Sequence, residues 1–370
     1  MKELLNSTLK AGVNFMKIVQ IVPRLPPHTD GVGDYSIQLA SQLLNAHGIA
    51  TQFLVFQQGI EIEPLVAGFP ATSISAYTPE AFLSVLPGNI DGIILHYSNY
   101  PYLQGKIDAP FWLPTALAMA VRQRNIKLIV MFHELPFFNF KKLKFLNPIQ
   151  SFVSRRLAKI ATTVVTDSAR FQAVLERWLQ HPVTCIPDFS TIGEPDDRIP
   201  PLSDRSRRII VFGGSDRSRV YQNYLKALLY SCQALGIEEI CDIGKSLNLQ
   251  PSDFPGVRLV QMGFQPAEAV RQLLLNSLAG FIDYSRFPGD LGKSSVFAAF
   301  CAHGLVPICS CYNPSEADGL EMHKHYLVPD RSLQNLSLTQ LQTVANNSNI
   351  WYKNHNIIQN TKVFASYLLE

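Results

Sequence analysis

Long apolar runs and basic blocks are both missing from this chain of 370 residues. Although 47% of the residues are hydrophobic, no run approaches the roughly 20 apolar residues that a helix needs to cross a bilayer. The formal net charge is only +3, and the longest basic cluster, Lys141 to Lys144, is flanked by phenylalanine on both sides. We therefore expect a protein that neither spans a membrane nor binds nucleic acid.

Signals of zinc binding and secretion are missing as well. The six cysteines lack the paired spacings of zinc ligands, so buried free thiols are expected. No leader with a basic start, an apolar core and a cleavage site precedes the first apolar strand pattern, and no repeat of solenoid length occurs. These absences favour a cytoplasmic protein without a metal site.

A stretch rich in phenylalanine and lysine, Phe137 to Phe145, leaves one membrane question open. Aromatic rings interleaved with cations suit a bilayer surface, so the stretch is consistent with peripheral attachment to the inner face of a membrane. A packed loop with solvated lysines is the simpler explanation of the same residues.

Short runs rich in Val, Ile and Leu alternate with helical patterns along the whole chain. Alternation of this kind is typical of parallel sheets that are covered by helices on both faces. The sequence therefore predicts an α/β protein. The predicted strands are Lys17–Val22, Gly92–Leu95, Lys127–Phe132, Thr162–Thr166, Arg208–Phe212, Glu239–Ile243, Leu278–Asp283 and Leu305–Cys309.

The stretch from Pro187 to Arg207 interrupts this alternation, because it is rich in Pro, Asp, Ser and Arg and has no apolar period. The alternation restarts after it, so we predict two Rossmann-like, doubly wound domains, residues 1–190 and 191–349, that face one cleft. In the second domain a helix is expected from Tyr221 to Leu235. The final amphipathic stretch, residues 350–370, is expected to pack back on the first domain.

The segment from Phe287 to Ile308 carries the strongest functional signal. A glycine-rich turn with Lys293, Ser294 and Ser295 runs directly into an apolar helix and then a strand. Free N–H groups at a helix start and the positive end of the helix dipole bind phosphate with little help from side chains. An apolar helix that opens with two serines for packing reasons alone is the alternative.

A second glycine turn is predicted at Asp30 to Tyr35, after the first strand and before a helical pattern. The chain thus offers two strand-loop-helix segments with the composition of a phosphate site, one in each predicted domain.

Together these motifs resemble the glycosyltransferases of the GT-B fold, and within them the family 4 type that transfers a sugar from a nucleotide diphosphate donor. The resemblance covers nearly the whole chain from Met16 onward. Four segments carry it in the right order: Gly31–Tyr35, Phe132–Glu134, Phe212–Tyr221 and Lys293–Ile308.

The resemblance implies a site for the donor diphosphate. Gly33 would let the phosphate approach the backbone, because glycine has no side chain. Arg217 or Arg219 would supply a guanidinium fork that matches phosphate oxygens, and the segment that begins at Lys293 would add its cation and amides. A plain tight turn at Gly33 and solvated arginines are the alternatives.

Catalytic residues are implied in the first domain. His133 follows a predicted strand, and in family 4 enzymes a histidine at this place lies beside the transferred sugar. Glu134 would orient that histidine or act as a base toward the acceptor. His96, at a similar strand end, is expected to line the acceptor pocket. A lone histidine after a strand is otherwise more often a structural hydrogen-bonding group.

The sequence departs from the family at a pair of glutamates. Family 4 members commonly carry two glutamates, separated by seven residues, that contact the sugar and the nucleotide ribose. Leu291 and Ala299 stand at these positions. Asp290 is one residue away and is expected to bind sugar hydroxyls after a small shift of the loop, whereas ribose recognition must come from elsewhere.

The resemblance also implies protein partners for the uracil base of the donor and for the charge of the leaving diphosphate. The backbone of Gly263 and Phe264 is expected to pair with uracil. The alternative is that this turn serves only the fold. No Asp-x-Asp pair stands at a predicted strand end, so no metal is expected, and cations together with a helix dipole would neutralise the diphosphate.

The resemblance therefore implies a retaining hexosyltransferase that needs no cofactor. It would transfer glucose or another hexose from a UDP-sugar to a polysaccharide or glycolipid acceptor in bacterial envelope or exopolysaccharide synthesis. The expected partners are a nucleotide-sugar donor and a saccharide or lipid-linked acceptor. The missing glutamates keep open a catalytically inactive nucleotide-sugar-binding regulatory protein, and a phosphorylase or a sugar-nucleotide epimerase is a third hypothesis because fold does not fix function.

Overall fold

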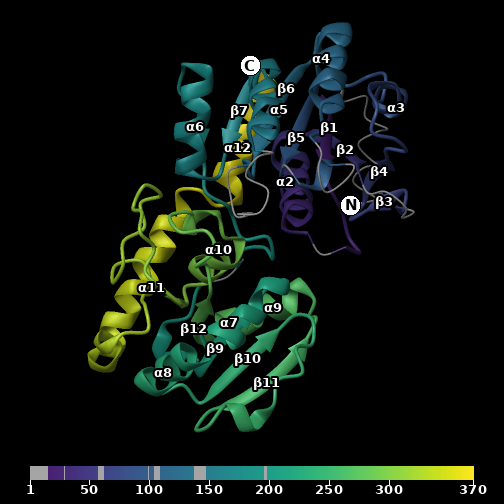
Figure 1. Cartoon of the computed structure of the whole chain (residues 1–370). Coiled ribbons are helices and arrows are strands. Elements are labelled where there is room, and N and C mark those ends of the chain that lie inside the picture. The colour runs from purple at the N-terminus through teal and green to yellow at the C-terminus, as the bar shows by residue number, and fades with distance from the viewer. Residues whose placement is uncertain are drawn as a thin grey trace. The chain divides into compact units, whose positions relative to one another are not determined.

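The computed structural model of the chain describes residues 16–28, 30–56, 62–98, 100–103, 109–136, 147–195 and 198–370. Contacts divide the chain into two compact units (Figure 1). Unit 1 is Met1–Ile186 together with Asn360–Glu370, and unit 2 is Pro187–Gln359. The sequence predicted boundaries after residues 190 and 349, whereas the contacts divide the chain after residues 186 and 359.

Unit 1 is built on a sheet that has eight strands among the described residues, in the order β3-β4-β2-β1-β5-β6-β7-β8. All neighbours are parallel except β3 and β4. The strands are β1 (Met16–Val22), β2 (Ile49–Val55), β3 (Leu65–Val66), β4 (Phe69–Ser73), β5 (Gly92–Tyr97), β6 (Lys127–Phe132), β7 (Thr163–Thr166) and β8 (Thr184–Cys185). The helices are α2 (Gly31–His47), α3 (Pro79–Val85), α4 (Trp112–Arg124), α5 (Asn147–Ile160), α6 (Ala169–Leu179) and α12 (Ile357–Leu369).

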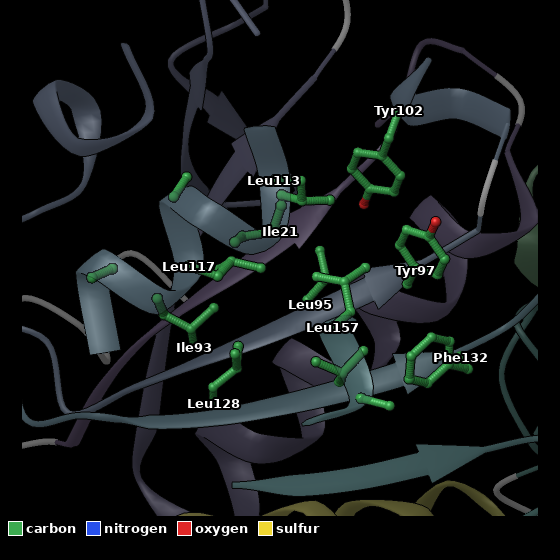
Figure 2. Packing of buried hydrophobic residues seen from close by; sticks show 14 of the residues in the cluster. Ile21, Ile93, Leu95, Tyr97, Tyr102, Leu113, Leu117, Leu128, Phe132 and Leu157 are labelled. Carbon is green, nitrogen blue, oxygen red and sulfur yellow. The ribbon is translucent and has the colours of Figure 1, made fainter. Parts of the chain in front are cut away.

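One face of this sheet forms the main apolar core of unit 1. Because side chains alternate along a strand, Ile93 and Leu95 of β5 share a face with Leu128 of β6. Figure 2 shows these side chains packed with Leu113 and Leu117, which lie four residues apart on α4. Full burial of each such side chain stabilises the fold by about 1.5–3 kcal/mol.

The opposite face of the sheet is covered by α2 and α12. Tyr35 of α2 is buried and donates its hydroxyl to Oδ1 of Asn360 in α12 over 3.0 Å. The C-terminal helix lies close to β5, because a Cβ on Gly92 would come within 3.0 Å of the Leu368 side chain. Polar residues of the central strands, Gln20 and His96, lie on this face.

Unit 2 is built on a parallel sheet whose described strands follow the order β11-β10-β9-β12-β13. The strands are β9 (Ser206–Phe212), β10 (Glu239–Ile243), β11 (Arg258–Gly263), β12 (Ser277–Ile282) and β13 (Val306–Cys309). The helices are α7 (Ser218–Asn223), α8 (Leu225–Leu235), α9 (Ala267–Leu275), α10 (Ser295–Ala302) and α11 (Leu338–Lys353). The direction of the strand order reverses between β9 and β12, where ligands of doubly wound sheets bind.

The predicted α/β class is confirmed, and every predicted strand is present within about one or two residues, the usual uncertainty of strand ends. The predicted helical stretch from Tyr221 to Leu235 is present, but Tyr224 leaves the helical region (φ −128°, ψ 17°) and divides it between α7 and α8. The six cysteines are free, as predicted, but their predicted burial is wrong for Cys185, which is half-buried, and for Cys311, which is exposed.

Residues 137–145, for which the sequence left open a packed loop or contact with a membrane surface, lie outside the described part of the chain. Within the described part, no helix has both the length and the apolar character that crossing a bilayer requires.

Gly280 in β12 provides a test of the packing in unit 2. A Cβ at this position would lie 2.4 Å from the ring of Phe300 in α10, which is fully buried. We expect Gly280→Ala to lower the free energy of unfolding by about 1–3 kcal/mol, because the ring must leave its position. Urea unfolding would measure this. The control Gly214→Ala meets no atom within 4 Å, and equal losses in both variants would contradict the packing.

Candidate functional site

A cavity of about 120 Å³ opens at the carboxyl ends of β9 and β12, where the strand order of unit 2 reverses. Its walls come from both strand ends, the loops that follow them and the start of α10. The lining residues include Phe212, Gly213, Gly214, Asp216, Arg217, Arg219, Asp283, Tyr284, Arg286, Phe287, Ser294 and Val296. Three arginines thus gather where a doubly wound sheet binds its ligand.

The start of α10 gives this cavity donors for an anion. Ser294 is the N-cap residue, and its hydroxyl oxygen accepts a hydrogen bond from the Phe297 amide over 3.1 Å. The amides of Ser295 and Val296 lie in the first turn, where a helix offers no intrahelical acceptor. The hydroxyl of Ser294 therefore serves the cap, and the amides of Ser295 and Val296 are suited to an anion.

Two other predicted residues lie just before α10. The ammonium group of Lys293 is 5.9 Å from the ring centre of Phe287, a residue of the cavity wall. Asp290 is only 2% exposed, and its carbonyl oxygen accepts a hydrogen bond from the Lys293 amide over 3.0 Å. The contact of Asp290 with a sugar stays a prediction.

Arg217 is a buried structural residue of this wall. Its side chain is 1% exposed, and Nε and Nη2 bond the two carboxylate oxygens of Asp242 at 2.7 and 3.1 Å. Nη1 and Nη2 also donate hydrogen bonds to the carbonyl oxygens of Gly213 and Lys245, respectively. Tyr221 also donates to Asp242 over 2.6 Å. Protein acceptors already occupy Nε, Nη1 and Nη2 of Arg217. The predicted contact of Arg217 with a diphosphate stays a prediction.

Arg219 and Arg286 are more accessible. Nε of Arg219 bonds Oδ2 of Asp283 at 2.9 Å, and its side chain is 28% exposed. Burial acts to raise the pKa of Asp283, but hydrogen bonds from Ser285 and Ser310 and from the arginine outweigh it and lower the pKa. The carboxylate therefore stays ionised and holds the guanidinium in place.

Sequence reasoning missed Arg286, which bonds both oxygens of Asp216 at 2.9 and 3.2 Å and is 41% exposed. The signal was present, since Arg286 directly precedes the Phe287 turn that we singled out.

Gly263 and Phe264 lie farther out on the same edge of the sheet. Gly263 ends the outer strand β11 with a positive φ of 68°, and its carbonyl oxygen accepts a hydrogen bond from the Gly244 amide. The side chain of Phe264 is 67% exposed. Their pairing with uracil stays a prediction.

In unit 1 the predicted glycine turn is wrong, because the helix begins earlier. Asp30 is the N-cap of α2, and its carboxylate accepts hydrogen bonds from the amides of Val32 and Gly33 at 2.9 and 3.4 Å. A Cβ on Gly33 would lie 2.5 Å from the carbonyl oxygen of Arg24. The missing side chain therefore lets the chain after β1 approach α2, and an approach of phosphate stays a prediction.

His133 lies directly after β6 and has hydrogen-bond partners at both ring nitrogens. Nε2 is 3.1 Å from Nδ1 of His96, and Nδ1 is 3.1 Å from Oδ2 of Asp167. The predicted orienting residue was Glu134, but its carboxylate accepts a hydrogen bond from Ser98 over 2.6 Å. Asp167 and His96 orient the ring instead.

His96 is fully buried, and its Nε2 is 2.8 Å from Oε1 of Gln20. Both ring nitrogens of His96 therefore have partners within unit 1. The predicted place of His96 in an acceptor pocket stays a prediction. Sequence reasoning missed Asp167 and Gln20. Asp167 directly follows β7, so the argument that strand ends carry functional residues, which identified His133, could also have identified Asp167. Gln20 lies inside an apolar strand, and no such signal marks it.

No protein-family model matches the chain, and no curated protein sequence matches it. The chain is similar in structure to Anabaena HepE in complex with UDP and glucose, at 12% identity and a TM-score of 0.63, over 96% of this chain and 99% of that one. It is also similar to a trehalose 6-phosphate synthase from Burkholderia multivorans, at 10% identity and a TM-score of 0.60, over 96% and 98%.

A third similar structure is an α-glucosyltransferase in complex with UDP and a 13-mer DNA that contains an HMU base. Its identity is 10% and its TM-score 0.58, over 96% of this chain and all of that one (100%). The chain therefore has the GT-B fold, and the fold prediction is confirmed.

The buried pair of Arg217 and Asp242 predicts a large stability effect. We expect Arg217→Ala to lower the free energy of unfolding by about 3–5 kcal/mol, because Asp242 would be left buried without its counter-charge. Arg286→Ala, which breaks an exposed pair, is expected to cost about 1 kcal/mol or less. Denaturant unfolding of both variants would measure the difference, and a similar small loss in both would show that Arg217 is not structural.

Asp34 in the first turn of α2 predicts a pH effect. Burial, and then the charge of Asp30, raise its pKa to about 6 in the folded protein, above about 3.9 in an unfolded chain. Its stabilising contribution is therefore present below about pH 4 and is lost as the pH rises through about 6. We expect Asp34→Asn to raise the melting temperature at about pH 7 and to change it little at about pH 4. An equal change at both pH values would contradict the shift.

Proposed function

We propose that the protein is a glycosyltransferase that uses a UDP-sugar. The observation that carries this proposal is the cavity at the strand reversal of unit 2, where Arg219 and Arg286 lie with the start of α10. A diphosphate is bound by cations together with helix-start amides, and this cavity is lined by arginines and by Ser294 and Val296 at the start of α10. Two of the similar structures contain UDP, one of them with glucose, which supports UDP-glucose as the donor.

The proposed reaction requires the diphosphate to leave with its charge neutralised. Arg219, Arg286 and Lys293 supply cations, and the amides of Ser295 and Val296 supply donors in the direction of the helix dipole. As the diphosphate departs, the sugar gains oxocarbenium character. We assign His133 and Glu134 of unit 1 to the transferred sugar and the acceptor, and we propose retention at the anomeric carbon.

The proposed acceptor is a polysaccharide or a glycolipid of the bacterial envelope. A surface feature of unit 1 supports a lipid-linked acceptor and peripheral membrane contact. Helix α5 exposes Ile149 and Phe152 on the same segment as Arg155, Arg156 and Lys159. Exposed apolar residues beside cations suit a surface of anionic lipid.

Calorimetric titration with UDP, UDP-glucose, GDP-mannose and ADP-glucose would test the donor site. We expect UDP and UDP-glucose to bind, and Arg219→Ala to weaken them by about tenfold or more through loss of a charge-assisted contact. The matched control is Arg258→Ala. Arg258 begins β11 at the amino edge of the same sheet, and its side chain is 72% exposed.

The outcomes separate the hypotheses. Binding of UDP-glucose without hydrolysis or transfer to any acceptor would favour a regulatory binding protein, and conversion of the sugar without an acceptor would favour an epimerase. If no nucleotide binds, or if Arg219→Ala and Arg258→Ala behave alike, the proposed donor site is wrong.

A further inference from the structure

A chain of hydrogen-bonded side chains crosses the sheet of unit 1, with one residue from each of five adjacent strands or strand ends. The order is Thr51 of β2, Gln20 of β1, His96 of β5, His133 after β6 and Asp167 after β7. The successive distances are 3.2, 2.8, 3.1 and 3.1 Å. Every member is at most 5% exposed.

The strand register explains why these residues meet. Thr51 pairs with Ile18, and Gln20 lies two residues farther along β1. Gln20 pairs with Ile94, and His96 again lies two residues farther along β5. Since side chains two residues apart share a face, each step keeps to one face and moves toward the carboxyl edge.

The next step of the chain continues this rule past the end of β6. His96 pairs with Met131, and His133 lies two residues beyond it. Phe132 pairs with Thr166, which brings His133 and Asp167 to the same level just past their strands. The chain therefore ends at the carboxyl edge, with His133 as its penultimate member.

The surroundings of His133 hold its ring in place. The ring of Tyr35 from α2 lies edge-on to both imidazoles, with ring centres 5.8 Å from His96 and 5.2 Å from His133. The titratable groups that face the ring include Asp167, His96 and Tyr35, while the neighbouring Glu134 carboxylate is bonded to Ser98.

The hydrogen-bond directions follow from Gln20. Its amide nitrogen donates to Thr51, and its Oε1 faces His96, so Nε2 of His96 carries a proton. Burial, followed by the charge of His133, lowers the pKa of His96 well below its ordinary value, so this ring is neutral. A neutral His96 then offers a lone pair at Nδ1, and His133 must donate to it through Nε2.

The second nitrogen of His133 faces a buried acid. The Asp167 side chain is 1% exposed, and its Oδ1 has no hydrogen-bond partner. A buried carboxylate is costly unless a counter-charge lies beside it, and protonation of Nδ1 on His133 supplies that charge. We propose that His133 is a fixed imidazolium ion held between Asp167 and His96, and that Gln20, His96 and Asp167 are its positioning residues.

This assignment changes the chemistry expected of His133. An imidazolium with both N–H groups engaged has no lone pair, so it acts as a fixed positive charge and not as a base. Within the proposed function, on which this consequence rests, the cation would favour negative charge on the donor or an acceptor oxygen. The protonation state itself can be tested without any activity.

Nuclear magnetic resonance of protein with ¹⁵N-labelled histidine would decide it. The chain has nine histidines, and His133→Gln would assign the signals of His133 by their loss. In the wild-type protein we expect both ring nitrogens of His133 to carry protons at about pH 7, because the Asp167 carboxylate lies beside Nδ1. One protonated and one unprotonated nitrogen at that pH would overturn the proposal, and the His133→Gln variant serves only to assign the signals.

Two asparagine substitutions test the role of Asp167. Asp167→Asn keeps the shape and removes the charge, so we expect Nδ1 of His133 to lose its proton, which leaves one protonated and one unprotonated ring nitrogen at about pH 7. The matched control, Asp91→Asn, removes an exposed carboxylate before β5 that accepts a hydrogen bond from the Lys17 amide, and it should leave both ring nitrogens of His133 protonated. The same protonation of His133 in the two variants would overturn the role of Asp167.

Kinetics supply a separate arm if the protein turns over UDP-glucose. Asp167→Asn is then expected to move the pH–rate profile to lower pH, because it removes the charge that favours the proton on Nδ1 of His133. An unmoved profile would overturn the positioning role. Absence of any turnover in the wild-type protein would count against the proposed function alone, because the nuclear magnetic resonance result stands without it.

Discussion

Burial of both faces of a parallel sheet is the constraint on which the rest of this structure depends. Such a sheet leaves few places for polar side chains, and the carboxyl edge is the main one because the strands end there together. In unit 1 this edge carries His133 and Asp167, and in unit 2 it carries the arginines after β9 and β12. Both candidate sites follow from one rule of architecture.

The charged groups at these edges are held by partners of opposite charge. Asp242 fixes Arg217 within the wall, whereas Asp283 and Asp216 hold Arg219 and Arg286 at more exposed positions. A cation that is already oriented loses little freedom when an anion binds. The same carboxylates weaken the net positive charge, so the amides of α10 matter more than the number of arginines suggests.

The fold was largely predictable, because runs of Val, Ile and Leu between helical patterns permit few alternatives to parallel sheets. The site was predictable only where it follows strand ends or a helix start, as with His133 and Ser294. Arg217 and Arg219 look equivalent in the sequence, yet one is buried on Asp242 and the other is partly exposed. Their difference depends on β10 and β12, which lie far along the chain.

The sequence by itself determined the α/β class, the more strongly apolar strands and the place of the anion-compatible helix start, because these depend on local periodicity and on neighbouring residues. Only the tertiary structure decided the partners: that Gly33 makes room for Arg24, and that Gln20 lies beside His96. The physical reason is register. Residues from separate strands meet through the pairing of whole strands, and no short segment of sequence contains that pairing.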